Sequence, residues 1–323
     1  MRALVTGAGG FLGRALVRAL VARGDGVRAL VRSEPQEPLA GPGVEVVRGD
    51  ALDPAAVRSA VRGCDVVFHL AGVRRASSLE DFHRGNAETT RIALDACVAE
   101  APGLRRFVLA GSLAASGPSA TPRREEEPFA PAEYYGASKA KAEQIALSFR
   151  DRLPVAVARP PRIMGPGDRE NLLFFRIAAR GVVLAIGGHE RPLSWIDVDD
   201  CARGMLALGD HPAAVGESFF LASPEPTSVV GLQQAIAAAL GARARRVPVP
   251  ERALHAAALL SEAFTRFGGR RLPLNRKLVR QILAPGWVCD PSKARERLGF
   301  LAQTPLADSL ARAAAWYRAH GLL

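Results

Sequence analysis

The sequence predicts an α/β protein built on a doubly wound parallel sheet, and its 323 residues are enough for two lobes. In the first half of the chain, short apolar runs alternate with segments of helical periodicity. This alternation is typical of a parallel sheet that is covered by helices on both faces. Beyond about residue 163 the alternation loosens, and helical segments dominate the remainder of the chain. We therefore expect a first lobe over residues 1–163 and a second, mostly helical lobe over residues 164–323.

The first lobe is expected to contain six strands with helices between them. The predicted strands are residues 3–5, 27–31, 44–47, 66–70, 106–110 and 155–158. The predicted helices are residues 11–22, 54–61 and 135–152. Pro54 suits the first turn of a helix, where its missing N–H would have no partner in any case. This order predicts a Rossmann-type fold, whose ligand lies beyond the carboxyl ends of the strands.

The second lobe is expected to be interrupted by loops and then largely helical. Gly and Pro break the chain at residues 165–167 and 187–188. One further strand is predicted at residues 218–221. The predicted helices are residues 199–208, 229–240, 250–267, 274–283 and 305–320.

Composition narrows the class of protein. The net charge of +11 comes mainly from arginines spread along the whole chain, without the dense interleaving of aromatic residues that would favour nucleic-acid binding. The four cysteines are widely scattered, so we expect reduced thiols in a cytoplasmic protein and no metal site. No signal peptide and no membrane span are expected. A helix on a membrane surface is the alternative for residues 253–260.

Residues 6–13, Thr-Gly-Ala-Gly-Gly-Phe-Leu-Gly, join the first strand to the first helix. Glycines at 7, 10 and 13 let the backbone approach a pyrophosphate at the positive end of the helix dipole. A glycine-rich turn without a ligand is the alternative. The T-G-x-x-G-x-x-G spacing resembles that of the extended short-chain dehydrogenase/reductases. The closing segment around residues 290–300 also resembles this family, so the resemblance covers essentially the whole chain. It implies that the second lobe binds substrate and that segments near 195–222 return to the first lobe.

A Tyr-x-x-x-Lys pattern is the second signal. Tyr135 and Lys139 lie one helical turn apart on the same face, where the ammonium would lower the pKa of the phenol. The pattern is common on ordinary helices, but its position after the glycine loop and several strands favours a catalytic pair. In the family that the chain resembles, the Tyr donates a proton and the Lys binds the cofactor ribose.

Two further catalytic residues follow from the resemblance. Ser112 follows a predicted strand and matches the catalytic serine, although Gly111 and Ser116 stand where a Ser and a Tyr are usual. An exposed turn serine is the alternative. Asn86 matches the helical Asn that supports the Lys and a water, and a helix-capping Asn is the alternative there.

The same resemblance implies a set of cofactor contacts at the loops that follow the strands. They are Gly7, Gly10, Phe11, Leu12, Gly13, Arg32, Ser33, Asp50, Ala51, Leu70, Ala71, Gly72, Tyr135, Lys139, Pro160 and Arg162. Asp50 could equally cap the helix that begins near Pro54. The second strand ends in Arg32-Ser33, with no acidic residue before Glu34, and an Arg suits a 2′-phosphate. We therefore expect NADP(H) as cofactor, with NAD(H) as the alternative.

Departures from the family pattern favour a reductase. Ser112-Leu113-Ala114 lacks the acidic residue that sugar dehydratases carry beside the serine, and Arg162 stands where nucleotide-sugar enzymes have Asn. The chain resembles reductases of the dihydroflavonol-reductase and hydroxysteroid-dehydrogenase type. This resemblance implies hydride transfer between the nicotinamide and a ketone or secondary alcohol. A nucleotide-sugar epimerase and a catalytically inactive dinucleotide sensor are the alternatives.

The remaining expectations concern the substrate and assembly. The candidate pocket residues are Val73, Leu113, Ala114, Phe174 and Trp195. Such an apolar set suits a lipid-like ketone, although Phe174 and Trp195 could equally be simple packing residues. Helices near residues 86–100 and 137–152 form a dimer interface in many relatives, so a homodimer is possible. The sequence does not identify the substrate or the direction of the reaction.

Overall fold

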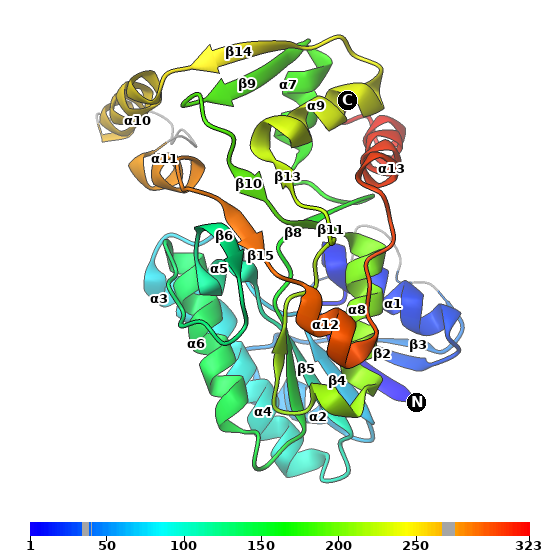
Figure 1. Ribbon diagram of the computed structural model, residues 1–323. Helices are drawn as coiled ribbons and strands as arrows, with labels where there is room; N and C mark the ends of the chain where they lie inside the picture. Colours follow the sequence, from blue (N-terminus) through cyan, green and yellow to red (C-terminus); the bar gives the residue numbers. More distant parts are fainter. Residues whose placement is uncertain (34–38, 40, 267–274) are drawn as a thin grey trace.

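The computed structural model describes residues 1–33, 39, 41–266 and 275–323, and its largest element is a seven-stranded parallel sheet (Figure 1). The strand order is β12-β7-β5-β4-β1-β2-β3. The strands are β1 (Arg2–Thr6), β2 (Gly26–Val31), β3 (Val44–Arg48), β4 (Val66–His69), β5 (Arg106–Ala110), β7 (Val155–Ala158) and β12 (Ser218–Phe219). The prediction of a doubly wound Rossmann-type sheet is therefore confirmed.

The strand order reverses between β1 and β4. From β1 the chain continues outward through β2 and β3, whereas β4, β5 and β7 extend in the opposite direction across the sheet. Val5 of β1 lies opposite Phe68 of β4, and Leu4 lies opposite Val67. In doubly wound sheets a crevice opens at such a reversal, beyond the carboxyl ends of the strands. This end of β1, β4 and β5 is where a ligand is expected.

Alternating side chains of the buried strands pack against two different helical layers. One layer consists of α1 (Phe11–Ala22) and α8 (Val198–Asp210), which cover Ala3, Val5 and Phe68. The other consists of α2 (Pro54–Val61), α4 (Thr89–Glu100) and α6 (Tyr134–Ser148), which cover strand residues such as Leu4 and Phe107. Because β12 and α8 belong to this sheet and its cover, the segment around residues 198–219 packs with the first lobe.

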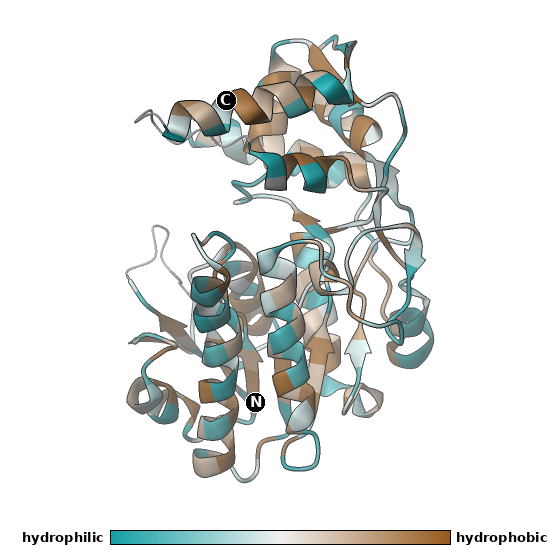
Figure 2. Cartoon of the chain, turned by 90° about the vertical axis from the view of Figure 1, so that its left-hand side faces the viewer, coloured by the Kyte–Doolittle hydropathy of each residue, from teal (hydrophilic) through white to brown (hydrophobic). Residues whose placement is uncertain are grey.

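The second lobe lies beyond the carboxyl ends of the sheet strands, at the top of Figure 1. Its core contains Phe175 and Tyr317, whose rings meet edge to face at 4.8 Å, together with apolar residues of three helices. These helices are α7 (Leu172–Ala179), α9 (Val229–Leu240) and α13 (Leu306–Ala319). Figure 2 shows the two lobes one above the other, with hydrophilic residues along the outer helices.

Short elements connect the lobes. Strands β13 (Thr227–Ser228), β10 (Pro192–Leu193), β15 (Trp287–Cys289) and β6 (Ser119–Arg123) form one small sheet. Two parallel pairs complete the strands: β8 (Arg162–Met164) with β11 (Trp195–Asp197), and β9 (Val182–Ile186) with β14 (Arg245–Val249). The remaining helices are α3 (Leu79–Phe82), a π-helical turn over His83–Glu88, α5 (Leu113–Ser116), a 3₁₀ turn over Pro212–Ala214, α10 (Glu251–Arg266), α11 (Arg276–Ile282) and α12 (Ser292–Leu298).

Several element boundaries differ from the predictions. The predicted helix at 135–152 ends at Ser148, and the predicted strand at 218–221 ends at Phe219. Residues 267 and 274, at the ends of two predicted helices, lie outside the described residues. None of the helices in the described ranges has both the length and the apolar character that a membrane crossing requires. All four cysteines are buried and unpaired, and burial raises the pKa of each thiol.

Candidate active site

Ser112, Tyr135 and Lys139 meet beyond the carboxyl end of β5. Ser112 follows this strand, and its side chain acts on Tyr135, in the first turn of α6, to lower the pKa of the phenol. The ammonium of Lys139 lies 6.0 Å from the centre of the Tyr135 ring and donates a 2.7 Å hydrogen bond to the Ala110 carbonyl. The structure therefore brings together three of the four residues that the sequence analysis selects as catalytic.

The start of α6 is fixed by a carboxylate and a glycine. Glu133 caps the helix, and its two carboxylate oxygens accept hydrogen bonds from the backbone N–H groups of Tyr135 (2.9 Å) and Gly136 (2.7 Å). A Cβ at position 136 would lie 2.3 Å from the Ala114 carbonyl oxygen. Only glycine therefore allows α6 to approach α5 closely enough for Tyr135 to reach Ser112.

The two departures from the family pattern near Ser112 have packing explanations. A Cβ on Gly111 would lie 2.7 Å from the Ala158 carbonyl oxygen, so a serine cannot fit there without a backbone shift. Ser116 is fully buried, and its hydroxyl lies 3.4 Å from the guanidinium of Arg159. Arg159 in turn forms a buried 2.8 Å ion pair with Glu143 of α6. This pair joins α6 to the end of β7 behind the candidate site.

The pKa of Tyr135 differs from the expected behaviour. Burial raises the pKa of its hydroxyl, while Arg74 and the hydrogen bond with Ser112 act to lower it. The cation that acts on the phenol is therefore Arg74, whose guanidinium carbon lies 5.9 Å from the centre of the Tyr135 ring, rather than Lys139. Burial and Arg74 lower the pKa of Lys139 to about 8, and Glu143 opposes this shift. Tyr135 is thus a neutral phenol at neutral pH.

Asn86 lies in the π-helical turn and is 1% exposed. Its side chain accepts a hydrogen bond from the Val73 N–H (2.9 Å) and donates to the Val73 carbonyl and to the Ser138 hydroxyl. The helix-capping alternative is therefore wrong. Asn86 instead fixes the loop that follows β4 against α6, next to Lys139.

The glycine loop leaves room for a pyrophosphate at the start of α1. Gly7 has φ +68°, and a Cβ there would lie 2.8 Å from the Ala71 nitrogen. A Cβ on Gly13 would lie 2.3 Å from the Gly7 carbonyl oxygen, so this glycine allows the helix to pack on the loop. Gly10 has ordinary dihedral angles, and no side chain caps the helix N–H groups, including those of Phe11 and Leu12. These donors fit the phosphates of a dinucleotide.

The carboxyl ends of β1 and β4 are joined by a side chain. The Thr6 hydroxyl oxygen accepts hydrogen bonds from the N–H groups of Leu70 (3.2 Å) and Ala71 (3.1 Å) and lies 2.9 Å from Nδ1 of His69. The hydroxyl must therefore donate to Nδ1, which places the imidazole proton on Nε2. Burial, followed by the Lys139 charge, lowers the pKa of His69 to about 3, so the ring is neutral. Leu70, Ala71 and Gly72 are thus fixed beside the glycine loop.

Arg32, Ser33 and Asp50 lie at the ends of β2 and β3, and all three side chains are exposed. The Asp50 carboxylate accepts a 3.0 Å hydrogen bond from the Leu52 N–H, and Ala51 lies in the same turn. The helix that begins at Pro54 is capped by Asp53, so the interpretation of Asp50 as its cap is wrong. Glu34 lies outside the described residues.

The candidate substrate residues separate into two groups. Val73, Ala114 and Phe174 are partly buried, and Phe174 lies 5.6 Å from the guanidinium carbon of Arg162. Trp195 is 3% exposed in the core of the second lobe, where its indole N–H donates to the Glu225 carbonyl (2.9 Å).

Leu113 is buried against Phe220 and Cys289. Its N–H donates a 3.0 Å hydrogen bond to the Pro160 carbonyl, which ties the start of α5 to the segment that follows β7. Leu113 and Trp195 therefore pack inside the molecule, whereas Val73, Ala114 and Phe174 remain partly accessible.

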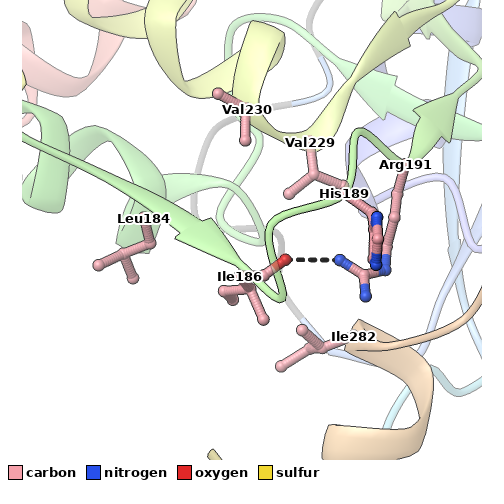
Figure 3. Close-up of a pocket in the computed structure, with 7 residues that line it drawn as sticks. All are labelled: Leu184, Ile186, His189, Arg191, Val229, Val230 and Ile282. Carbon is pink, nitrogen blue, oxygen red and sulfur yellow. Dashed lines mark hydrogen bonds between the residues drawn. The ribbon is translucent and has the colours of Figure 1, made fainter. Parts of the chain in front are cut away.

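Figure 3 shows a separate apolar hollow in the second lobe, where Arg191 donates a 2.6 Å hydrogen bond to the Ile186 carbonyl. It is lined by Leu184, Ile186, His189, Arg191, Val229, Val230 and Ile282. Sequence reasoning did not find this hollow, because its lining comes from distant segments. Within the described ranges, no cluster of three or more His, Cys, Asp or Glu side chains could hold a metal ion.

Sequence reasoning did not single out Arg74, Glu133 or Asn171, although the loop over residues 73–84 is expected near the substrate. Glu133 gives no signal, because Ser, Thr, Asp and Asn are the usual helix caps. Arg74 is one of many arginines in a loop, and Asn171 becomes notable only through its contact with Arg162.

Comparison with known proteins identifies the relatives of the chain. The NAD dependent epimerase/dehydratase family matches residues 3–222. Ceramide reductase from Caulobacter vibrioides is 33% identical over 99% of this chain and 95% of its own length. A 2-alkyl-3-oxoalkanoate reductase from Stenotrophomonas maltophilia is 33% identical over 97% of this chain and 98% of its own length.

Solved structures agree with this assignment. The crystal structure of gox2253 superimposes with a TM-score of 0.83 at 27% identity, covering 99% of both chains. UDP-glucuronic acid 4-epimerase from Bacillus cereus in complex with NAD shares the fold, with a TM-score of 0.77 at 20% identity and 99% coverage of both chains. The chain belongs to the NAD dependent epimerase/dehydratase family and is an NAD(P)-dependent oxidoreductase of the extended short-chain dehydrogenase/reductase type.

Proposed function

We propose that the protein is an NADP(H)-dependent reductase that converts a ketone to a secondary alcohol at a Ser112-Tyr135-Lys139 site. The observation that carries this proposal is the position of the Tyr135 ring, 6.0 Å from the buried ammonium of Lys139, with the Ser112 side chain acting on the pKa of its hydroxyl. The names of two relatives, ceramide reductase and 2-alkyl-3-oxoalkanoate reductase, support reduction rather than epimerisation.

The roles of the three residues follow from their positions. Because burial raises the pKa of Tyr135, its hydroxyl remains protonated at neutral pH and can give a proton to a carbonyl oxygen. Ser112 orients that oxygen through its own hydroxyl, and Lys139 would bind the nicotinamide ribose. The nicotinamide, when bound, supplies the hydride. Asn86 positions the Val73 loop beside this site and does not touch the reacting atoms.

Residues 1–163 would bind the cofactor, and residues 164–323 would cover the substrate. The preference for NADP(H) rests on the exposed Arg32 and Ser33 at the end of β2, because a guanidinium can bind a 2′-phosphate through two parallel hydrogen bonds. The glycine loop would hold the pyrophosphate through the backbone N–H groups at the start of α1.

The decisive experiment replaces the hydroxyl of Tyr135. Tyr135→Phe should slow single-turnover oxidation of NADPH by roughly 10²- to 10⁴-fold with 3-oxodecanoate or its methyl ester, whichever the unmodified protein reduces faster. Tyr134→Phe is the matched control, because it removes a hydroxyl from the neighbouring, 40% exposed ring. Full single-turnover activity in Tyr135→Phe would exclude this mechanism. A tightly retained NAD without net NADPH consumption would indicate an epimerase instead.

A further inference from the structure

Two cations lie beside the Tyr135 ring, and a third lies on a neighbouring segment. Arg74 lies in the loop after β4, Lys139 lies on α6, and Arg162 lies on β8. The guanidinium carbon of Arg74 and the ammonium nitrogen of Lys139 lie 5.9 and 6.0 Å from the centre of the Tyr135 ring. Over the described part of the chain, none of the three cations forms an ion pair with a carboxylate. Two buried arginines elsewhere in the protein do: Arg28 pairs with Glu45 and Arg159 with Glu143.

The side chain of Arg162 is held in place by neutral and aromatic groups. Its Nη1 donates to the side-chain oxygen of Asn171, whose amide nitrogen donates to the Asp168 carboxylate. The face of Phe174 lies 5.6 Å from the guanidinium carbon. Asn171 and Asp168 are both buried, so the orientation of this chain of hydrogen bonds is fixed. The Asp168 carboxylate therefore stabilises the positive charge of Arg162 with Asn171 between them. It does not use any of the N–H donors of Arg162.

Arg74 and Arg162 lie on segments that meet, because Arg75 pairs with Glu170 at 3.2 Å and Arg162 donates to the adjacent Asn171. Burial lowers the pKa of Arg162, and the positive charge of Arg74 lowers it further. Arg74 acts in the same direction on Lys139 and Tyr135. An arginine has five donors in a planar fork, and Arg162 uses one of them in its hydrogen bond to Asn171. Concentrated positive charge with unused donors is suited to binding an anion.

The position of these arginines identifies the source of the anion. The pyrophosphate of a dinucleotide is expected at the start of α1, and a 2′-phosphate at the end of β2. Arg74, in contrast, lies over the ring of the proposed proton donor, and Arg162 faces Phe174 of the second lobe. An anion held here would therefore adjoin the reacting carbonyl group of the substrate.

We infer that Arg74 and Arg162 form an anion subsite beside Tyr135 that binds the carboxylate of a 3-oxo acid substrate. This inference rests on the proposed function and names its substrate class. In a 3-oxo acid one carbon separates the carboxylate from the ketone, so a carboxylate held by these arginines would keep the ketone close to Tyr135. The sequence analysis expects Arg162 among the cofactor contacts through its backbone, and that expectation is compatible with a substrate role for its side chain.

The subsite is tested with an acid and its ester. For 3-oxodecanoate, Arg74→Gln and Arg162→Gln should each lower kcat/KM by about 10- to 100-fold, as expected for loss of a hydrogen bond between charged groups. For methyl 3-oxodecanoate, which lacks the charge, the loss of kcat/KM should be smaller than for the acid. The loss that remains with the ester reports the effect of the arginines on Tyr135 and Lys139 rather than on a carboxylate. Arg297→Gln is the matched control, because Arg297 is an exposed arginine on α12. It should leave both substrates unaffected.

Three results would overturn the subsite: an unmodified protein that prefers the ester, equal losses for acid and ester, or a weaker NADPH affinity in Arg162→Gln. Arg74→Gln alters an exposed side chain and should fold even where Arg162→Gln does not.

Failure of the proposed function gives a different pattern, in which neither compound oxidises NADPH or Tyr135→Phe has full activity. In that case calorimetric binding of 3-hydroxydecanoate to the unmodified protein and to Arg74→Gln still tests the subsite. Equal affinity of the two proteins would reject it.

Discussion

On the nucleotide side of the candidate site, the surface is made by the backbone of one short segment, residues 6–13. On the side where we propose the substrate, the surface is expected to come from the side chains of Arg74, Tyr135 and Arg162, which lie far apart in the sequence. Gly7 and Gly13 are needed because a Cβ at either position would meet backbone atoms at 2.8 and 2.3 Å. A backbone surface suits the phosphates of a cofactor, which stay the same for every substrate, whereas a side-chain surface can change with the substrate.

The two sides should therefore respond differently to substitution, and the largest effect is expected at the glycine loop. Gly10→Val should abolish dinucleotide binding, because its side chain would occupy the space in front of the helix N–H groups. The protein should remain folded, since Gly10 has φ −74° and an added Cβ would lie 3.2 Å from a single backbone oxygen, that of Gly7.

Fluorescence titration with NADPH measures the affinity, and circular dichroism measures the fold. Gly103→Val is the control, because a Cβ at this position would have no neighbour within 4 Å. If Gly10→Val bound NADPH normally, the backbone of residues 6–13 would have no role in binding the cofactor. The distinction between a backbone surface for the cofactor and a side-chain surface for the substrate would then be wrong.

The end of β2 is the exception on the nucleotide side, because here a side chain is expected to read the cofactor. Arg32→Asp should lower NADPH affinity by about 10- to 100-fold, through loss of a charge-assisted hydrogen bond. NADH affinity should change much less, since it has no 2′-phosphate. Arg297→Asp makes the same change of charge on the exposed face of α12 and controls for the overall field. An unmodified protein that binds NAD at least as tightly as NADP would show this assignment to be wrong.

The same contrast explains what the sequence can predict. The strands and the glycine loop are encoded by local patterns, so the sheet and the start of α1 agree closely with the prediction. Tyr135 and Lys139 are also local, being one helical turn apart. Strands such as β10 and β13 have only two residues each and depend on partners distant in the chain, so no periodicity marks them.

The environment of the catalytic residues is equally non-local. The sequence predicts a cation next to Tyr135 and identifies it as Lys139, which lies four residues further along the same helix. The contact of Arg74 with Tyr135 depends on the folding of a distant loop, so the sequence pattern does not predict it. The structure assigns the larger influence on the phenol to Arg74. Likewise, the Asn86 side chain binds the Val73 backbone through a loop closure that its sequence neighbours do not reveal.

Lys139 belongs to both the nucleotide side and the substrate side, because α6 places it beside Tyr135 and we propose that it binds the cofactor ribose. The smallest expected effect concerns the titration of this residue. Burial and Arg74 lower its pKa to about 8 in the protein without cofactor. The ammonium is therefore present below about pH 8 and is lost as the pH rises through this value. Dinucleotide affinity should accordingly decline by a few-fold above pH 8, because a charge-assisted hydrogen bond becomes a neutral one.

The pH dependence separates Lys139 from the other titrating groups nearby. His69 has a pKa of about 3 and stays neutral throughout the range, and the pKa of Tyr135 is raised, so neither changes charge near pH 8. NADPH affinity measured from pH 6.5 to pH 9.5 should show one inflection in the unmodified protein and none in Lys139→Met. In Arg74→Gln the inflection should move to higher pH, because the positive charge that helps to lower the Lys139 pKa is gone. An inflection that persists in Lys139→Met would assign the titration to another group and separate Lys139 from cofactor binding.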